Sequence, residues 1–326
     1  MSEAPLISVV VAYHDEPEEF LRECLQSLLD QTFELWEGIL VDDASHSEAS
    51  STLVDEIGDA RFRVIRHDTS LGLGAARNTG IRSAKAPLVA LLDADDRLAD
   101  QFLDLTYHAL EDQPAVDWVV VDWQCFGMSD EVWPFPIDDS LNCPAHFLFV
   151  GSGVLMRKDV WTSVGGYSEE KALRGGEDWD FWLTAAEQDL QPVHLPQALY
   201  QYRIHPEAMT FRSARFDNYK FRQAIHRRHR MAFRSMGMDC PHCPSPRARV
   251  AKFLAQGLAV SSHAYLGSGQ RLKGIGLAAR AFLLQPTNPS FGRHLLSSLL
   301  PIGLRSGIHR LRRWRTSKPP STPTNS

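Results

Sequence analysis

The chain has 326 residues, of which 44% are hydrophobic and 23% charged, and its formal net charge is −6. This composition is ordinary for a folded globular protein and argues against a disordered chain. Because no run of eighteen apolar residues, no secretory signal pattern and only five scattered cysteines are present, we expect a cytoplasmic protein without membrane spans or a disulfide framework.

Charge is divided unevenly along the chain. Residues 1–210 hold 13 Lys and Arg against 38 Asp and Glu, whereas residues 211–326 hold 21 against 2. One uniform domain would not show such a division. We therefore expect an acidic domain over residues 1–210, a basic helical region over 211–315 and a disordered tail over 316–326.

Short apolar runs and helical spacings alternate through the acidic part. The expected strands cover 6–12, 38–41, 62–65, 88–92 and 118–121, and the expected helices run through Phe20 to Leu29, through Leu53 and Ile57, and from about Gly74 to Ser83. This βα alternation predicts an α/β fold with a mostly parallel central sheet.

Polar residues follow three of these strands. The first strand ends at Ala12-Tyr13, the second is followed by Asp42-Asp43, and the fourth by Asp93-Ala94-Asp95-Asp96. Clustered carboxylates favour a divalent metal, and hard oxygen ligands select Mg²⁺ or Mn²⁺. Since ligands bind at the carboxyl ends of such strands, we predict a nucleotide pocket there.

Each residue of this pocket has a candidate role and an alternative. Tyr13 could stack on a base, Asp43 could accept from a base N–H, and Asp93 could bond a ribose hydroxyl. The alternatives are a core aromatic for Tyr13 and a helix cap for Asp42 or Asp43.

The segment Gly72-Leu73-Gly74-Ala75-Ala76-Arg77-Asn78 invites comparison with a dinucleotide fingerprint. Arg77 stands where that fingerprint needs a third glycine, and the segment follows the third strand rather than the first. We interpret it as a glycine turn that opens a helix. Arg77 would then face the pocket and pair with a carboxylate or a phosphate.

Seven blocks in order make the chain from about Pro5 to Arg212 similar to the family-2 glycosyltransferases, which have the GT-A fold. The blocks are Ser8-Val9-Val10-Val11-Ala12-Tyr13, Leu40-Val41-Asp42-Asp43-Ala44-Ser45, Gly72 to Gly80, Leu91-Leu92-Asp93-Ala94-Asp95-Asp96, Gly165-Gly166-Tyr167, Gly176-Glu177-Asp178-Trp179-Asp180-Phe181-Trp182-Leu183 and Tyr202-Arg203-Ile204-His205. The resemblance implies transfer of a sugar from a nucleotide diphosphate sugar, with a UDP-sugar favoured. The acceptor would be a hydroxyl of a glycan or lipid-linked molecule, and the anomeric carbon would be inverted.

The resemblance also implies roles for particular residues. These are Ala12, Tyr13, Asp43 and Asp93 for the nucleotide, Asp95 and His205 for Mn²⁺ or Mg²⁺, and Asp178 of the Glu177-Asp178 pair for the catalytic base. The chemistry is consistent, because an inverting displacement needs a base beside the acceptor and a neutralised leaving diphosphate. The other interpretation of Glu177-Asp178 is a pair of acidic residues that favours a helix N-terminus.

Two rival function classes stay open. A non-catalytic nucleotide-sugar-binding scaffold would have a degenerate site, and the carboxylates at 93, 95 and 178 count against it. A nucleotidyltransferase would want a Gly- and Lys-rich phosphate loop after the first strand, where Tyr13-His14-Asp15-Glu16 stands. Trp133 and Trp179 could stack on sugars, although packing is the commoner role of such rings.

The basic part reads as helices. A helical hairpin is expected over residues 263–284, ahead of Pro286. The segment 295–315 resembles a basic amphipathic helix, which would suit an anionic membrane surface such as the inner face of the cell membrane. Alternatively this helix packs on the catalytic domain or neutralises its charge. No nucleic-acid module is recognised, so nucleic acid is not expected.

A zinc site is a further hypothesis for this region. His226 and His229 together with Cys240 and Cys243 provide four candidate ligands. The order is reversed from that of a zinc finger, and surface histidines are the alternative.

Overall fold

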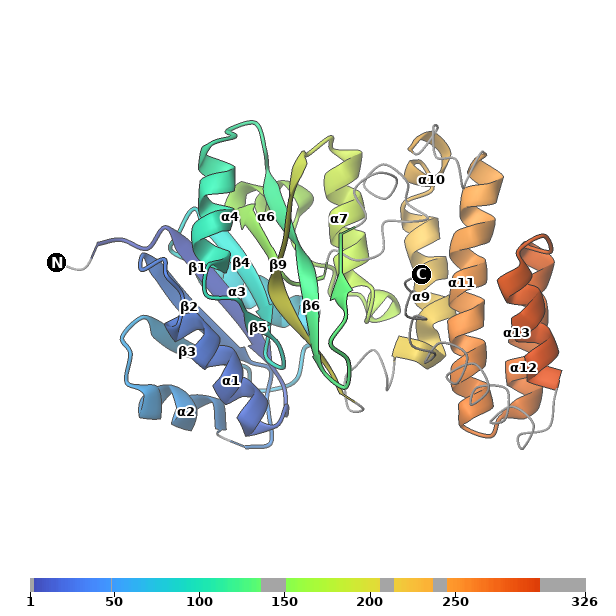
Figure 1. Cartoon of the computed structure of the whole chain (residues 1–326), viewed down its shortest axis with the longest axis horizontal. Coiled ribbons are helices and arrows are strands. Elements are labelled where there is room, and N and C mark those ends of the chain that lie inside the picture. The colour runs from blue at the N-terminus through green and yellow to red at the C-terminus, as the bar shows by residue number, and fades with distance from the viewer. Residues whose placement is uncertain (1–2, 48, 136–150, 206–213, 237–244, 300–326) are drawn as a thin grey trace, which may run out of the picture.

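The computed structural model describes residues 3–47, 49–135, 151–205, 214–236 and 245–299. An α/β part that contains the whole sheet is followed by a stack of helices, which lies on the right of Figure 1. The expected α/β fold with a C-terminal helical appendage is therefore confirmed.

The first part alternates strands and helices, as the sequence predicts. In chain order it contains β1 (Ile7–Tyr13), α1 (Glu18–Leu29), β2 (Trp36–Asp42), α2 (Ala49–Ile57), β3 (Phe62–Arg66), α3 (Leu73–Ser83), β4 (Leu88–Asp93), β5 (Arg97–Leu98) and α4 (Phe102–Glu111). It continues with β6 (Trp118–Gly127), β7 (Val132–Trp133), β8 (Val154–Arg157), α6 (Lys158–Val164), a short 3₁₀ helix (Lys171–Leu173), α7 (Glu177–Glu187) and β9 (Pro192–Ile204).

The strands form one sheet in the order β3-β2-β1-β4-β8-β6-β9-β5, with β7 beside β6. Strands β3, β2, β1 and β4 are parallel, as are β6 and β9, whereas β8 runs antiparallel between β4 and β6. Strand β8 is absent from the sequence prediction, because a four-residue apolar run has no decisive period.

Both faces of the sheet are buried. Along β1, Val10 packs on the face covered by α3 and α7, and Val9 and Val11 pack on the face covered by α1 and α4. Strands buried on both faces carry unbroken apolar runs, since neither set of alternating side chains meets water. This burial explains why the apolar runs of the sequence locate these strands.

The basic part forms helices α9 (Ala214–Arg228), α10 (Ala232–Ser235), α11 (Pro246–Gly267), α12 (Arg271–Leu284) and α13 (Pro289–Leu299). Helices α11 and α12 make a hairpin as expected, although it begins at Pro246 rather than at residue 263, and Gly269 in its turn has φ 82°. In the described parts of the chain, no helix is both long enough and apolar enough to cross a bilayer.

The helices pack on the α/β part through aromatic rings. Trp179 of α7 lies 5.5 Å from Phe221 of α9 and 5.4 Å from Phe253 of α11, measured between ring centroids. Arg222 lies over the Trp179 ring at 4.5 Å. Trp179 is therefore a packing residue only 8% exposed, and the idea that it stacks on a sugar is wrong.

A buried histidine forms a second contact between the two parts. The ring nitrogens of His229 bond Asp180 and Glu187 of α7, each at 2.9 Å. His229 therefore has no ring nitrogen left for zinc. Cys240, Cys243 and residues 300–326, which include most of the expected amphipathic helix and the tail, lie outside the described residues.

Candidate active site

The strand register brings the predicted polar residues to one edge of the sheet. Ala12 pairs with Asp93 and Tyr13 pairs with Asp42, so β1, β2 and β4 end at the same level. Ala12 is half-buried at this edge. The structure thus places these residues together at the carboxyl end of the sheet, where the sequence predicts a pocket.

Arg77 is a buried cation at this edge. Gly72, with φ 100°, opens α3, and the next turn of the helix directs Arg77 inward. The guanidinium donates to Asp93 Oδ1 at 2.8 Å and to Ser152 Oγ at 3.0 Å, and the residue is 4% exposed. A guanidinium so placed can pair with phosphate as well as carboxylate.

Asp95 and His205 lie together, as the family pattern implies. A His205 ring nitrogen is 3.0 Å from Asp95 Oδ2. Burial, followed by the charge of Asp93, raises the pKa of Asp95. The adjacent Asp96 has a different role, because its carboxylate accepts from the Tyr200 hydroxyl at 2.6 Å and the Arg203 amide at 2.7 Å in the interior.

Glu16 is a site residue that the sequence analysis missed. Burial raises its pKa to about 7, and the charges of Asp95 and Asp93 add to the shift. The available signal was its position just after β1, because the segments that follow β2 and β4 also carry carboxylates. Glu16 therefore lies within electrostatic range of Asp93 and Asp95.

Asp178 lies in the first turn of α7. Burial, followed by the charge of Glu177, raises the pKa of Asp178 to about 7, while the nearby Arg77 lowers it. Glu177 differs, because its carboxylate accepts from the amides of Gly175 at 2.6 Å and Gly176 at 3.1 Å. Glu177 therefore holds the turn before the helix, and Asp178 is the ionisable group beside the site.

Residues 151–153 join these groups. Ser152 accepts from Arg77, and a Cβ placed on Gly151 would lie 3.6 Å from Asp178 Oδ2 and 3.8 Å from the Trp123 ring. The absence of a side chain at Gly151 leaves space between Asp178 and Trp123. Asp93, Arg77, Ser152 and Asp178 consequently belong to one compact site.

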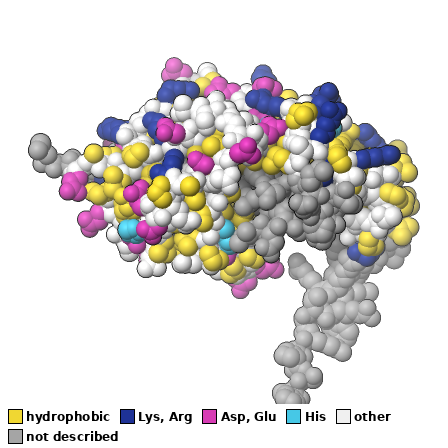
Figure 2. All heavy atoms as spheres, turned by 90° about the horizontal axis from the view of Figure 1, so that it is seen from above, with side chains coloured by type: hydrophobic (Ala, Val, Ile, Leu, Met, Phe, Trp, Pro, Cys, Tyr) yellow, Lys and Arg dark blue, Asp and Glu magenta, His cyan; other side chains and the backbone are white. Residues whose placement is uncertain are grey.

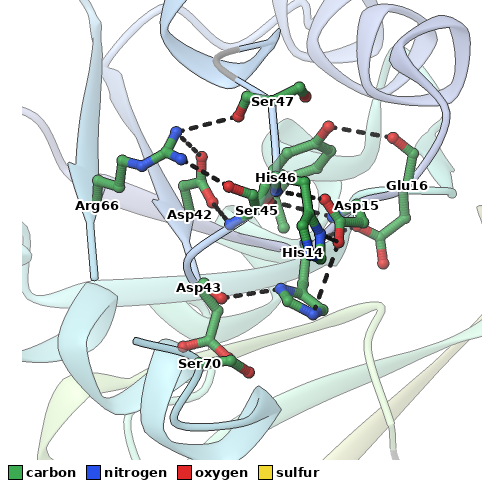
Figure 3. A network of polar contacts seen from close by, with 11 residues as sticks. His14, Asp15, Glu16, Asp42, Asp43, Ser45, His46, Ser47, Arg66 and Ser70 are labelled. Atoms are coloured by element: carbon green, nitrogen blue, oxygen red, sulfur yellow. Dashed lines mark hydrogen bonds and ion pairs between the residues drawn. The ribbon is translucent and has the colours of Figure 1, made fainter. Parts of the chain in front are cut away.

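Asp43 is saturated by its own loop. Its two carboxylate oxygens accept from the rings, hydroxyls and amides of residues 67–72, namely His67, Ser70, Leu71 and Gly72, at 2.7 to 2.8 Å. Burial opposes ionisation of Asp43, but these donors outweigh it and lower the pKa. Around it, Arg66 bonds Asp42 and Ser45, and His14 donates to the Asp43 carbonyl (Figure 3).

Tyr13 occupies the core rather than an open pocket. The residue is 2% exposed, and its hydroxyl donates to the Glu16 carbonyl at 3.1 Å. Its ring belongs to the hydrophobic cluster under α1. This position matches the core-aromatic alternative and leaves no ring face for a base to stack on.

Asp95 and its neighbours provide some, but not all, of the ligands that a divalent metal needs. In the portions of the chain that the structure describes, no three His, Cys, Asp or Glu side chains are grouped closely enough to hold an ion. Mg²⁺ is often bound by only one or two carboxylates, with phosphates and water completing its shell. The repulsion that raises the pKa of Asp95 is the setting that such a cation would relieve.

A cavity of about 560 Å³ lies at the start of α3, and Asp93, Asp95 and Asp178 are not among the residues that line it. The start of α3, the loop before α7 and one face of α9 line it, and its charged residues include Lys171, Arg174, Lys220 and Glu177. Arg174 crosses it to donate to the Leu71 carbonyl at 3.3 Å. The cavity therefore adjoins both the glycine turn and the start of the helix that carries Asp178.

Known proteins identify the domain that carries this geometry. Residues 8–161 match the family model described as Glycosyl transferase family 2. The part of the chain that contains the sheet is thus similar to glycosyl transferase family 2. The resemblance found in the sequence blocks is thereby confirmed, and some relatives match beyond residue 161.

Three relatives illustrate the similarity. An uncharacterized glycosyltransferase of Methanocaldococcus jannaschii is 26% identical over 211 residues, which cover 61% of this chain and 71% of that protein. The uncharacterized glycosyltransferase EpsJ of Bacillus subtilis is 31% identical over 221 residues, 63% of each chain. The O-antigen biosynthesis protein RfbC of Myxococcus xanthus is 29% identical over 227 residues, 67% of this chain but only 17% of RfbC.

Solved structures share the fold. S. aureus TarS in complex with UDP-GlcNAc has a TM-score of 0.61 at 17% identity, over 94% of this chain and 87% of that one. GalNAc-T7 with UDP, GalNAc and Mn²⁺ has a TM-score of 0.51 at 19% identity, over 62% of this chain and 43% of that one. At these identities the likeness shows the fold alone, and it confirms the expected GT-A fold.

Proposed function

We propose that this protein moves a sugar from a nucleotide diphosphate sugar to a hydroxyl of a glycan or lipid-linked acceptor, with inversion. The observation that carries the proposal is Asp178, a carboxylate with a pKa near neutrality beside the buried Arg77–Asp93 pair. A UDP-sugar is favoured as donor because the similar TarS structure contains UDP-GlcNAc. Polysaccharide synthesis is favoured by the name of the relative RfbC.

In this mechanism Asp178 takes the proton of the acceptor hydroxyl as that oxygen attacks the anomeric carbon. A base with a pKa near 7 is partly ionised at neutral pH and still holds a proton well, which general base catalysis requires. Arg77, fixed by Asp93 and Ser152, is oriented to stabilise the negative charge of the leaving diphosphate. Glu177 positions Asp178 by holding the preceding turn.

We propose that Asp95 and His205 hold a divalent metal, Mn²⁺ or Mg²⁺, with Glu16 as a nearby carboxylate. Such a metal acts as a Lewis acid toward the diphosphate of the donor. The 3.0 Å approach of His205 to Asp95 and the raised pKa of Asp95 and Glu16 support this assignment. GalNAc-T7, which shares the fold, was solved with Mn²⁺.

For the nucleotide we propose that Asp93 bonds the ribose. Asp43 has its oxygens filled by residues 67–72, so its contribution to base binding is to shape that loop at the edge beside Ala12. Tyr13 supports this edge from the core.

We also propose that the basic helical part contacts an anionic membrane surface. Several leucines of α12 and α13 are exposed, including Leu272 at 88%, Leu283 at 75% and Leu296 at 67%. Figure 2 shows hydrophobic side chains gathered at the end of the molecule that these helices form. Exposed leucines beside cations suit an anionic interface. Sedimentation with phosphatidylglycerol vesicles, but not with phosphatidylcholine vesicles, would support this contact.

The first test is donor hydrolysis by the purified full-length protein. A panel of UDP-, GDP- and dTDP-sugars is incubated with Mn²⁺ or with EDTA, and released nucleoside diphosphate is measured. We expect metal-dependent release from one donor class and none from the Asp95→Ala variant. If no donor is hydrolysed and no nucleotide binds, the non-catalytic scaffold becomes the better description.

A further inference from the structure

A row of aromatic rings leads away from the candidate base. Trp123 of β6 lies 5.1 Å from Tyr202 of β9, and Tyr202 lies 5.7 Å from Trp133 of β7, measured between ring centroids. The planes of neighbouring rings are tilted by 31° and 36°. These three residues, called the aromatic row below, come from three neighbouring strands of one sheet.

The aromatic row is anchored at its inner end and open at its outer end. Tyr200, which is fully buried and bonded to Asp96, lies 5.2 Å from Trp123. Trp123 and Tyr202 are half-buried, and Trp133 is 37% exposed. The exposure thus rises from the interior toward Trp133, which sits on a two-residue strand at the sheet margin.

The inner end of the row lies near the candidate base, on the other side of Gly151. Gly151 separates the Trp123 ring from Asp178 Oδ2, and a Cβ there would contact both. At Gly153, by contrast, a Cβ would clash with the Tyr200 ring at 2.7 Å, so this position requires glycine. A molecule that delivers a hydroxyl to Asp178 past Gly151 therefore meets Trp123.

The outer rings are held in fixed orientations. The Trp133 indole N–H donates to Glu131 at 3.3 Å, and the backbone of Trp133 is in register with Trp123 across the β6–β7 pair. Fixed, partly exposed aromatic faces lose little conformational freedom on binding. A pyranose offers such rings a flat face of C–H groups and leaves its hydroxyls at the rim for water and polar side chains.

We propose that Trp123, Tyr202 and Trp133 form a stacking platform for the acceptor glycan, which therefore contains more than one sugar unit. This inference rests on the proposed function, since it takes Asp178 as the group that receives the acceptor hydroxyl. The unit that carries the reacting hydroxyl contacts Trp123, and the following units lie over Tyr202 and Trp133. Binding to units remote from the reacting hydroxyl would position that hydroxyl for attack.

The test measures glycan binding separately from donor chemistry. The full-length protein, saturated with UDP and Mn²⁺, is applied to an array of defined mono- and oligosaccharides. Affinities for the sugars retained are then measured by calorimetry. We expect at least one oligosaccharide to bind, and its component monosaccharides to bind at least tenfold more weakly.

Three variants assign that binding to the row. Trp133→Ala should weaken oligosaccharide binding at least tenfold, and Trp133→Phe should restore most of it because a flat ring remains. Val132→Ala is the matched control, since Val132 is 52% exposed on the same short strand and should bind as the unmodified protein does. Unchanged melting temperatures would show that all three variants fold.

The outcomes separate this proposal from the one it rests on. If the unmodified protein hydrolyses a donor but no oligosaccharide binds, or if Trp133→Ala binds as well as Val132→Ala, the platform is wrong and the transferase assignment stands. If no donor is hydrolysed and no nucleotide binds, the proposed function itself fails.

Discussion

At the residue scale, the carboxylates of the candidate site differ in the groups that they bond. Asp96 and Glu177 accept from backbone amides in the interior, whereas Asp178 accepts from the Trp179 amide and stays half-buried beside Arg77 with a raised pKa. Adjacent carboxylates therefore have different roles. Asp96 and Glu177 stabilise the local backbone, whereas Asp95 and Asp178 face the candidate site. The sequence motif alone does not make that distinction.

Asp178→Asn is expected to lose turnover while nucleotide binding remains. Removing a general base typically costs roughly 10²- to 10⁴-fold in rate, and the amide keeps the size of the side chain. Donor hydrolysis or transfer rates and nucleotide titration calorimetry would measure the two effects. Turnover within threefold of the unmodified protein would contradict the assignment of Asp178 as base.

The pH profile should report the same group. Because burial raises the pKa of Asp178 to about 7 and a base acts when deprotonated, kcat/KM should fall about tenfold per pH unit below 7 and level off above it. Glu16 titrates in the same range and could add to the slope through metal binding. Rates measured from pH 5 to 9 at saturating Mn²⁺ isolate the base, and a flat profile would rule it out.

Asp43→Ala should destabilise the protein, because it leaves the donors of residues 67–72 without their acceptor. Hydrogen bonds to a buried charge are worth about 1.5–3 kcal/mol each, so a loss of at least about 2 kcal/mol is expected. Denaturant unfolding measures it, with Asp68→Ala, an exposed neighbour, as control. Equal stabilities of the two variants would show that Asp43 does not hold this loop.

At the element scale, α7 serves two sides of the molecule. Its first turn carries Asp178, and its Asp180 and Glu187 side chains bond His229, which directly follows α9. The same helix packs Trp179 against Phe221 and Phe253. The position of the candidate base thus depends on the basic helices as well as on the sheet.

This contact should depend on pH. Burial lowers the pKa of His229, but the bonds to Asp180 and Glu187 outweigh it, so the folded-state pKa is raised above 6.5. The stabilisation is fully present below pH 6.5 and is lost as pH rises through the folded-state pKa. Arg228 also pairs with Asp180 and keeps part of the contact.

His229→Ala should therefore lower the free energy of unfolding by roughly 2–4 kcal/mol at pH 6, and by less at pH 9. Urea unfolding of the variant and of the unmodified protein at both values provides the comparison. An equal difference at the two pH values would mean that packing, rather than the charged histidine, makes the contact.

At the scale of the whole molecule, one hydrophobic cluster crosses the proposed boundary near residue 210. It contains Val10 and Leu91 of the sheet and also Phe221, Phe233 and Phe253 of the basic helices. The change in charge along the chain consequently marks a change of surface rather than a break in the core.

A fragment of residues 1–210 is expected to fold poorly, because removing the helices would expose Trp179 and the surrounding apolar surface. Burial of a large aromatic side chain is worth about 2–3 kcal/mol, and several residues lose their partners at once. Circular dichroism and proteolysis of the fragment, compared with the full chain, would show it. A cooperative transition in the fragment at the temperature of the full chain would instead establish an independent domain.

The sequence by itself determined the order and type of the buried elements from β1 to β4, the position of β6 and the resemblance to the family. Strands buried on both faces must be continuously apolar, and residues such as Asp93, Asp95 and Asp178 are recognisable wherever their side chains point. The sequence could not predict the hydrogen-bond partners of each carboxylate, because the donors come from segments that are distant in the chain.

Only the tertiary structure showed that Asp43 is filled by its own loop, that Tyr13 and Trp179 are packing residues, and that Glu16 joins the site. It alone placed β8 between β4 and β6 and set Trp123 beside Asp178 across Gly151. The physical reason is the same in each case. Hydrogen bonds and ring contacts join residues that are far apart in the sequence, whereas the hydrophobic periodicity that predicts a helix or strand is a property of one short segment.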